Sequence, residues 1–213
     1  MILNEANVHF NSVANISFKN LFSEETMNDI VRDKGKAGKL LERTLGLANT
    51  NSNLDFEDGE MKTNKCDSNG KPLETIAITQ ISSHIDDLIN AIPFEDTWMY
   101  KKISNMLYIP VCKEGAPEDW FFLPSIHINL LSDKYKNILA QLKEDYEYIC
   151  TEIKNTCDRG EMLSTINGKY IQIRTKDSSP YHPIHSKIYN RKVSDKNRAF
   201  YFRTAFIQAI KEV

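Results

Sequence analysis

Three residues near one another in the sequence could together hydrolyse a phosphodiester bond: Asp55, Glu60 and Lys62. Residues two apart on a strand point to the same face, so Glu60 and Lys62 would project together while Met61 turns to the core. A reversal at residues 58–59 could bring Asp55 alongside. Two converging carboxylates make a site for a hard divalent cation, usually Mg²⁺.

Such a cation polarises a phosphoryl oxygen and makes a nucleophile from water, while a nearby lysine stabilises the negative charge that develops on the phosphate. The same spacing also allows a simpler interpretation. Acidic turns often precede strands, and Glu60 and Lys62 could be an ordinary charge pair across a strand face. The short motif alone does not separate the two hypotheses.

The surrounding pattern predicts the elements that would hold these residues. Residues 34–45 have apolar positions at helical spacing and predict a helix. The chain then reverses at residues 58–59 into a strand. A second turn at 67–71 and an alternating strand at 75–81 follow, so we expect a small antiparallel meander.

The remainder of the chain alternates predicted strands and helices. The sequence predicts a buried strand at 105–111, an amphipathic helix at 133–155, a strand at 170–174, a loop at 178–186, and a strand running into a helix at 200–210.

Composition predicts one folded domain rather than a disordered or membrane-embedded chain. The 213 residues are 41% hydrophobic, which is enough for a substantial core. The four cysteines form no CxxC pair, so we expect the protein to reside in a reducing cytoplasm and to have no structural zinc site. We expect no signal peptide, and no stretch approaches the roughly 20 apolar residues of a membrane span.

The charge is unevenly distributed along the chain. Residues 159–213 carry 11 Lys and Arg against 4 Asp and Glu, whereas the rest carries 16 against 25, although the whole chain has a net charge of only −2. A basic region of this kind can follow a phosphate backbone. An ordinary lysine-rich surface is the alternative.

Several blocks of sequence, in order, resemble the MutH family of DNA endonucleases, which includes a mismatch-repair nickase and GATC-cutting restriction enzymes. The resemblance spans roughly residues 32 to 206. Its blocks are RDKG with LLE and LG at 32–46, Asp55 with EMKT at 60–63, GKPLET at 70–75, Trp98 with Lys102 and LYIPV at 107–111, GKYIQIR with Lys176 at 168–176, and Arg198, FY at 200–201 and Phe206.

The resemblance implies an active site and a cofactor. It makes Asp55, Glu60 and Lys62 catalytic and adds Glu42 as a fourth member, with the three acids holding Mg²⁺. A solvated helix residue is the alternative for Glu42. Lys34 and Lys102 fall where the family has basic residues near the DNA or the scissile phosphate; ordinary surface lysines are their alternative. The alternative is a catalytically inactive DNA-binding protein of the same fold. It would lack some of these acidic residues, whereas all of them are present here.

The resemblance also implies residues that read the DNA sequence. Arg174 and Lys176 correspond to the family's readers of the GATC site, and an arginine bound to guanine contributes roughly 1–3 kcal/mol against a wrong base. Tyr201 matches a tyrosine placed near the adenine. Alternation puts Tyr201 opposite Phe200 and Phe202, which favours an exposed side chain over a core aromatic.

Departures from the family pattern leave some assignments open. Asp55 and Glu60 are closer together than in the family, so Glu57 or Asp58 could replace Asp55. Residues 177–197 match poorly, which favours a type II restriction enzyme over a repair nickase. The His182 and His185 pair has no third ligand nearby in sequence, so we do not expect a metal there.

The implied fold is α/β, with a restriction-endonuclease-like central mixed sheet flanked by helices and a basic C-terminal lobe along a DNA cleft. We expect one domain over residues 1–213, with a catalytic lobe at about 1–112 and a DNA-reading lobe at about 113–213. The expected partner is double-stranded DNA, bound by a monomer or a transient dimer, with a MutL-type activator left open.

Overall fold

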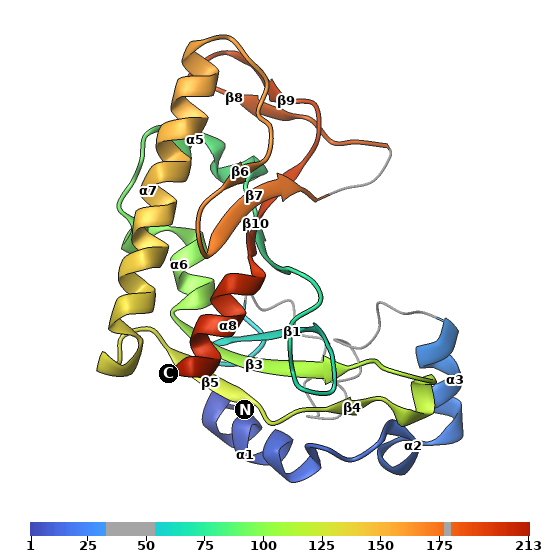
Figure 1. Cartoon of the computed structure of the whole chain (residues 1–213). Coiled ribbons are helices and arrows are strands. Elements are labelled where there is room, and N and C mark those ends of the chain that lie inside the picture. Colours follow the sequence, from blue (N-terminus) through green and yellow to red (C-terminus); the bar gives the residue numbers. More distant parts are fainter. Residues whose placement is uncertain (33–53, 177–179) are drawn as a thin grey trace. The chain divides into compact units, whose positions relative to one another are not determined.

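The computed structural model describes residues 1–32, 54–176 and 180–213 (Figure 1). Within these ranges the chain forms two units, each built from two stretches of sequence. The first unit is Met1–Glu74 with Ser104–Asn129, and the second is Thr75–Ile103 with Leu130–Val213. The expected helix at 34–45 lies outside the described residues.

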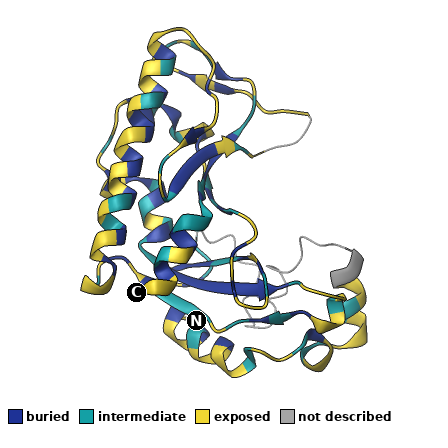
Figure 2. Cartoon of the chain, in the orientation of Figure 1, coloured by how far each residue is buried: buried dark blue, intermediate teal, exposed yellow. Residues whose placement is uncertain are grey.

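The first unit contains a mixed sheet, as the expected fold class requires. Its central strand β3 (Asn105–Cys112) runs parallel to β1 (Glu60–Cys66) and antiparallel to β4 (Phe121–Phe122) and β5 (Ile126–Asn129). Seven of the eight residues of β3 are buried (Figure 2). A nearly continuous apolar run is typical of a strand covered on both faces.

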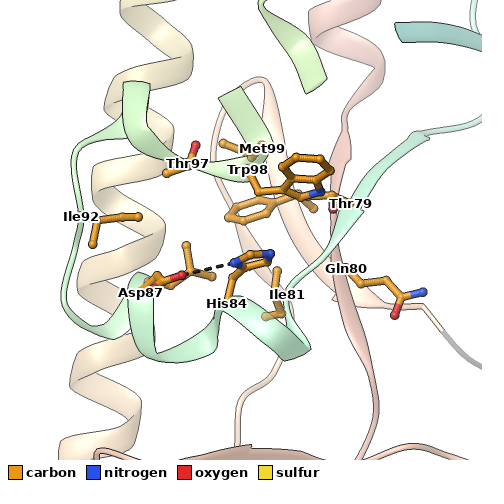
Figure 3. A pocket seen from close by; sticks show the side chains of 11 residues that line it. Thr79, Gln80, Ile81, His84, Asp87, Ile92, Thr97, Trp98 and Met99 are labelled. Carbon is orange, nitrogen blue, oxygen red and sulfur yellow. Dashed lines mark hydrogen bonds and ion pairs between the residues drawn. The ribbon is translucent and has the colours of Figure 1, made fainter. Parts of the chain in front are cut away.

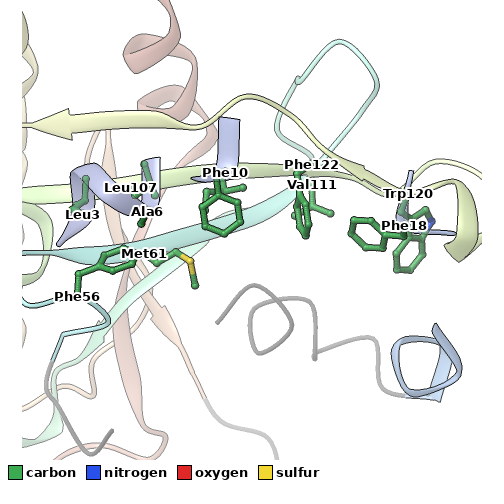
Figure 4. Packing of buried hydrophobic residues seen from close by; sticks show 11 residues of the cluster. Leu3, Ala6, Phe10, Phe18, Phe56, Met61, Leu107, Val111, Trp120 and Phe122 are labelled. Carbon is green, nitrogen blue, oxygen red and sulfur yellow. The ribbon is translucent and has the colours of Figure 1, made fainter. Parts of the chain in front are cut away.

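Three short helices of the first unit precede its sheet in the chain: α1 (Leu3–Val13), α2 (Phe18–Leu21) and α3 (Glu24–Arg32). The first two bury aromatic side chains against the sheet strands, with Phe10 and Phe18 packing on Phe122 (Figure 4). Burial of each such side chain contributes roughly 1.5–3 kcal/mol. Met61 of β1 belongs to the same apolar cluster.

The second unit is organised around another sheet, in the strand order β2, β10, β7, β6. These strands are β2 (Ile76–Gln80), β6 (Ile166–Asn167), β7 (Ile171–Thr175) and β10 (Arg198–Phe202). Strand β10 pairs antiparallel with both β2 and β7. The last strand runs directly into helix α8 (Thr204–Glu212), which confirms the expected strand-to-helix end of the chain.

Helices of the second unit include the long α7 (Lys136–Asp158), preceded by a single 3₁₀ turn at Asp133–Tyr135. This confirms the amphipathic helix expected at 133–155. The apolar face of α7 contains one buried acid, Asp145. The shorter elements are η1 (Ser82–His84), α5 (Ile85–Ile89), η2 (Phe94–Asp96) and α6 (Trp98–Ile103).

One expectation about strand pairing was wrong. Strands β1 and β2 do not form an antiparallel meander, because β1 pairs with β3 and β2 pairs with β10. Parallel strands need a long crossover, and here the connection from β1 to β3 supplies β2, α5 and α6 to the second unit. Each unit is therefore discontinuous in sequence.

The loop expected at 178–186 contains part of a hairpin instead. Strand β8 (Ile184–Ser186) pairs with β9 (Arg191–Ser194). Asp86 of α5 accepts hydrogen bonds from the Ser186 hydroxyl at 2.6 Å and from the Lys187 amide at 3.0 Å, which fixes the hairpin to the second unit. Among the described residues, no helix is both long and apolar enough to span a membrane.

Candidate active site and nucleic-acid interface

The acidic turn at residues 55–59 leads the chain into β1. The backbone N–H of Phe56 donates to the carbonyl oxygen of Gly59 at 2.9 Å, which closes the turn. Gly59 has no room for a side chain, because a Cβ would lie 2.6 Å from the carbonyl oxygen of Asn105. This close approach fixes the end of the turn against β3 and makes Glu60 the first residue of β1.

The three acids of this turn have different partners. Asp55 accepts a hydrogen bond through Oδ2 from the backbone N–H of Met61 at 2.9 Å, so its carboxylate lies against the first residues of β1. Glu57 instead lies 2.7 Å from the N-terminal ammonium group. Asp58 accepts the backbone N–H of Leu3 at 2.7 Å. Of the three, Asp55 is therefore the acid turned towards the strand that carries Glu60.

Glu60 and Lys62 lie on one face of β1, as the alternation of a strand predicts. The Nζ atom of Lys62 is 2.5 Å from Oε1 of Glu60, and the two side chains are only 12% and 5% exposed. Met61, which stands between them in the sequence, belongs to the apolar cluster instead. The ion pair that the sequence allowed is thus formed, and it is nearly buried.

The described acids have the donor chemistry of a divalent-cation site. Mg²⁺ takes carboxylate oxygens, and a carboxylate accepts at both oxygens, so the hydrogen bonds of Asp55 and Glu60 do not exhaust their capacity. Glu42 and Lys34 lie outside the described residues. Within residues 1–32, 54–176 and 180–213, no group of three His, Cys, Asp or Glu side chains is arranged so that it could hold a metal ion.

A polar chain that sequence reasoning missed supports the acidic turn. The side-chain amide of Asn105 donates to the carbonyl oxygen of Asp58 at 2.6 Å. His127 on β5 lies 2.8 Å from the amide oxygen of Asn105 through Nε2. Burial lowers the pKa of His127, with a smaller opposing effect from Asp58. No local sequence pattern signals this chain, because its members come from three separate segments.

Three residues expected to contact DNA come together on the second sheet. The guanidinium carbon of Arg174 lies 5.2 Å from the ring centre of Tyr201, and Nζ of Lys176 lies 5.9 Å from the same ring. Arg174 also donates to the hydroxyl of Thr75 at 3.2 Å. Burial raises the pKa of Tyr201 although Arg174 opposes the shift, so the phenol stays protonated at neutral pH. A cation-rich face with one aromatic ring results.

The expected position of Tyr201 opposite the core is confirmed, although the side chain is half-buried rather than exposed. Phe200 and Phe202 on either side of it are 2% and 1% exposed. The pairing of β10 with β2 shifts register between Phe200 and Tyr201. Such irregularities often re-aim a side chain.

Lys102 lies in the second unit rather than with the acidic turn. Its Nζ is 5.8 Å from the ring centre of Trp98 on the same helix. Lys102 and Lys176 both line a groove of about 390 Å³ on this unit. Two of the lysines that the sequence singled out therefore share one concave surface.

Asp145 is a buried residue that sequence reasoning placed in no role. Its carboxylate accepts the backbone N–H groups of Lys169, Tyr170 and Ile171 at 2.9, 2.5 and 3.0 Å. A Cβ at Gly168 would lie 2.6 Å from the Asp145 side chain, so this turn requires glycine. The carboxylate fixes the start of β7, the strand that carries Arg174. The signal available in sequence was an acid within the apolar stripe of α7.

The first unit has an acidic turn beside a strand lysine, and the second has a cationic face with an aromatic ring. These features are typical of a nuclease with an α/β fold. The family model "DNA mismatch repair enzyme MutH" matches residues 46–145. The chain is 31% identical over 189 residues to the DNA mismatch repair protein MutH of Shewanella woodyi, covering 87% of this chain and 79% of that protein.

Two further relatives show the same pattern. The MutH protein of Buchnera aphidicola is 31% identical over 188 residues, covering 84% of this chain and 81% of the relative. That of Vibrio cholerae is 28% identical over 207 residues, covering 93% and 90%. The chain belongs to the MutH family of DNA endonucleases.

Proposed function

We propose that this protein is a Mg²⁺-dependent, site-specific DNA endonuclease that acts in mismatch repair. The observation that carries the proposal is the nearly buried pair of Glu60 and Lys62 at the start of β1, with Asp55 turned towards the same strand. A buried ion pair contributes little to stability, because loss of hydration offsets the attraction of the charges. A catalytic role explains this ion pair better than a contribution to the stability of the fold does.

Each proposed role follows from the donor chemistry of the residue. Asp55 and Glu60 would hold Mg²⁺, together with Glu42 as the resemblance implies. Bound Mg²⁺ would polarise a phosphoryl oxygen and lower the pKa of water. Lys62 carries its positive charge beside Glu60, where it would stabilise the charge that develops as the phosphodiester bond breaks.

The second unit would recognise the DNA. Arg174 is an exposed cation at the end of β7 beside Lys176 and Tyr201, and its planar guanidinium can donate two hydrogen bonds to one guanine. Lys102 would contact the phosphate backbone, and Lys34 would do so as the resemblance implies. The proposed recognition site is GATC, as in the family that the chain resembles.

A mismatch-repair role is favoured by the relatives, each of which is named a DNA mismatch repair protein. A repair nickase would cut the unmethylated strand of hemimethylated DNA as a monomer or transient dimer, with a MutL-type activator. A type II restriction enzyme is the second candidate. It is favoured by residues 177–197, which match the family pattern poorly and contain the β8–β9 hairpin.

One experiment separates these roles. Plasmid with GATC sites would be prepared unmethylated, hemimethylated and fully methylated, incubated with the protein and Mg²⁺, and the cut ends sequenced. Nicks confined to the unmethylated strand of hemimethylated DNA support the repair role. Double-strand breaks in unmethylated DNA alone support restriction. Intact plasmid in all three preparations, with and without a MutL-type activator, would overturn the endonuclease proposal.

A further inference from the structure

The groove that contains Lys102 and Lys176 is polar and cationic. It has a volume of about 390 Å³, and a third basic side chain, His84, lines it together with Ser82 and Ser83. The three basic residues come from different segments: Lys102 from α6, Lys176 from the position after β7, and His84 from η1. Among the described residues that line the groove, none is acidic.

An acid lies close to His84 but outside this groove. The Nδ1 atom of His84 is 3.2 Å from Oδ2 of Asp87, and Asp87 lines the smaller pocket that adjoins the groove (Figure 3). Figure 3 shows the Asp87 carboxylate joined to the imidazole ring by a dashed line, with Trp98 above the ring in this view. Asp87 itself does not line the groove.

A histidine donates a hydrogen bond to an anionic oxygen only through a ring nitrogen that carries a proton. With Nδ1–H bound to Asp87, neutral imidazole leaves Nε2 as a bare acceptor, which disfavours an anionic oxygen. Protonation would make Nε2 a donor and add a positive charge to the groove that Lys102 and Lys176 also line. Asp87 from α5 is hydrogen-bonded to the ring, and Lys102 from α6 and Lys176 after β7 line the same groove as His84.

We propose that the groove lined by Ser82, Ser83 and His84 together with Lys102 and Lys176 is a binding site for backbone phosphates of the DNA substrate. His84 is its proton-dependent member, and the two exposed serine hydroxyls are neutral donors. Phosphate oxygens are bound by lysines, hydroxyl groups and histidine without regard to base identity. The inference rests on the proposed function, because it requires DNA as the ligand.

The test is a binding measurement that needs no cleavage. Fluorescence anisotropy of a labelled duplex containing GATC, without divalent cation, would be recorded over a salt series at about pH 6 and about pH 8, where histidine changes charge. The variants are His84→Asn and Ser83→Asp. Their controls make the same changes at exposed positions outside the groove: His185→Asn on β8 and Ser164→Asp.

We expect His84→Asn to weaken binding about fivefold at the lower pH and little at the higher pH. The slope of log affinity against log salt should fall by about 0.9, the value for one lost phosphate contact. Ser83→Asp should weaken binding at both pH values, since it puts an anion in the groove whatever the state of His84. The two control variants should match the wild type at both pH values.

The outcomes separate this inference from the proposed function. If the wild type binds the duplex while His84→Asn and Ser83→Asp bind no differently from their controls, the groove is not a phosphate site and the endonuclease proposal stands. If the wild type fails to bind duplex DNA at any salt concentration, both proposals are wrong. Should His84→Asn fail to fold, as judged by its thermal melt, the Ser83→Asp comparison decides the inference.

Discussion

At the scale of single residues, the acidic turn shows how partners distinguish side chains of the same type. Asp55, Glu57 and Asp58 are close in sequence and share a charge, so spacing gave no reason to prefer one. Asp55 bonds to the backbone of β1, whereas Glu57 and Asp58 bond to the first residues of the chain. These contacts favour Asp55 as the metal ligand that accompanies Glu60.

The first prediction tests that preference. Asp55→Asn should lower the rate of Mg²⁺-dependent DNA cleavage by roughly 100-fold or more, because a proposed ligand loses its charge. Glu57→Gln is the matched control, since it changes a neighbouring acid in the same way, and it should cut DNA at close to the wild-type rate. Gel assays of plasmid nicking measure both. Greater loss in Glu57→Gln would transfer the ligand role to Glu57.

The second prediction concerns pH and His127. Burial lowers the pKa of His127 from its usual 6.5 in the folded chain, so the unfolded chain takes up the proton more readily. The contribution of His127 to the free energy of unfolding is therefore complete above about pH 6.5 and is lost as the pH falls below it.

Urea unfolding at about pH 7.5 and about pH 5.5 would measure this effect. His127→Gln should lose less stability between the two pH values than the wild type does. The control is His9→Gln, a change at an exposed histidine of α1, which should behave as the wild type. An equal pH dependence in His127→Gln and the wild type would show that another group causes the change.

The third prediction concerns Arg174. Arg174→Ala should leave the stability of the protein nearly unchanged, because the side chain is exposed, and should relax or abolish the choice of cutting site. Loss of a guanine contact corresponds to roughly 1–3 kcal/mol of discrimination. Sequencing the ends of the cut DNA measures it. An unaltered cleavage pattern would remove Arg174 from sequence recognition.

At the scale of elements, the sequence predicted local structure better than pairing. The long helix at 133–155, the strand at 170–174 and the strand into helix at 200–210 all agree with the structure, because each has a clear periodicity of its own. The meander was wrong because strand partners are chosen by contacts between distant segments. Strand β8 was missed because three residues are too few to show alternation.

For the candidate site, too, the sequence predicted what depends on local geometry and missed what depends on contacts between distant segments. Glu60 and Lys62 could be predicted to share a face, because that depends only on the geometry of one strand. Their burial and the supporting Asn105 and His127 could not, because those depend on the parallel pairing of β1 with β3. The joining of Arg174 with Tyr201 depends likewise on the register of β7 with β10.

The fourth prediction concerns the element that fixes β7. Asp145→Ala removes the acceptor of three backbone N–H groups, leaving buried donors without a partner, and should lower the free energy of unfolding by about 3 kcal/mol. Glu144→Ala, at the exposed neighbouring position, should change it by about 0.5 kcal/mol or less. Urea unfolding measures both. Similar losses in the two variants would contradict the proposed role of the carboxylate.

At the scale of the whole molecule, the net charge of −2 conceals an uneven distribution of charge along the chain. The proposed catalytic acids belong to the first unit, and the cationic residues Lys102, Arg174 and Lys176 belong to the second. The crossover from β1 to β3 passes through the second unit, so the two are linked by more than one segment of chain. We propose that DNA binding and cleavage are shared between them.

The central claim is that the lysine beside Glu60 takes part in phosphodiester cleavage, and replacing it tests the claim most directly. Lys62→Ala and the control Lys65→Ala, an exposed lysine on the same strand, would be compared for plasmid cutting with Mg²⁺ and for duplex binding. We predict that Lys62→Ala cuts about 100- to 1,000-fold more slowly while binding is retained, and that Lys65→Ala cuts normally. Cutting by Lys62→Ala at the wild-type rate would contradict the account.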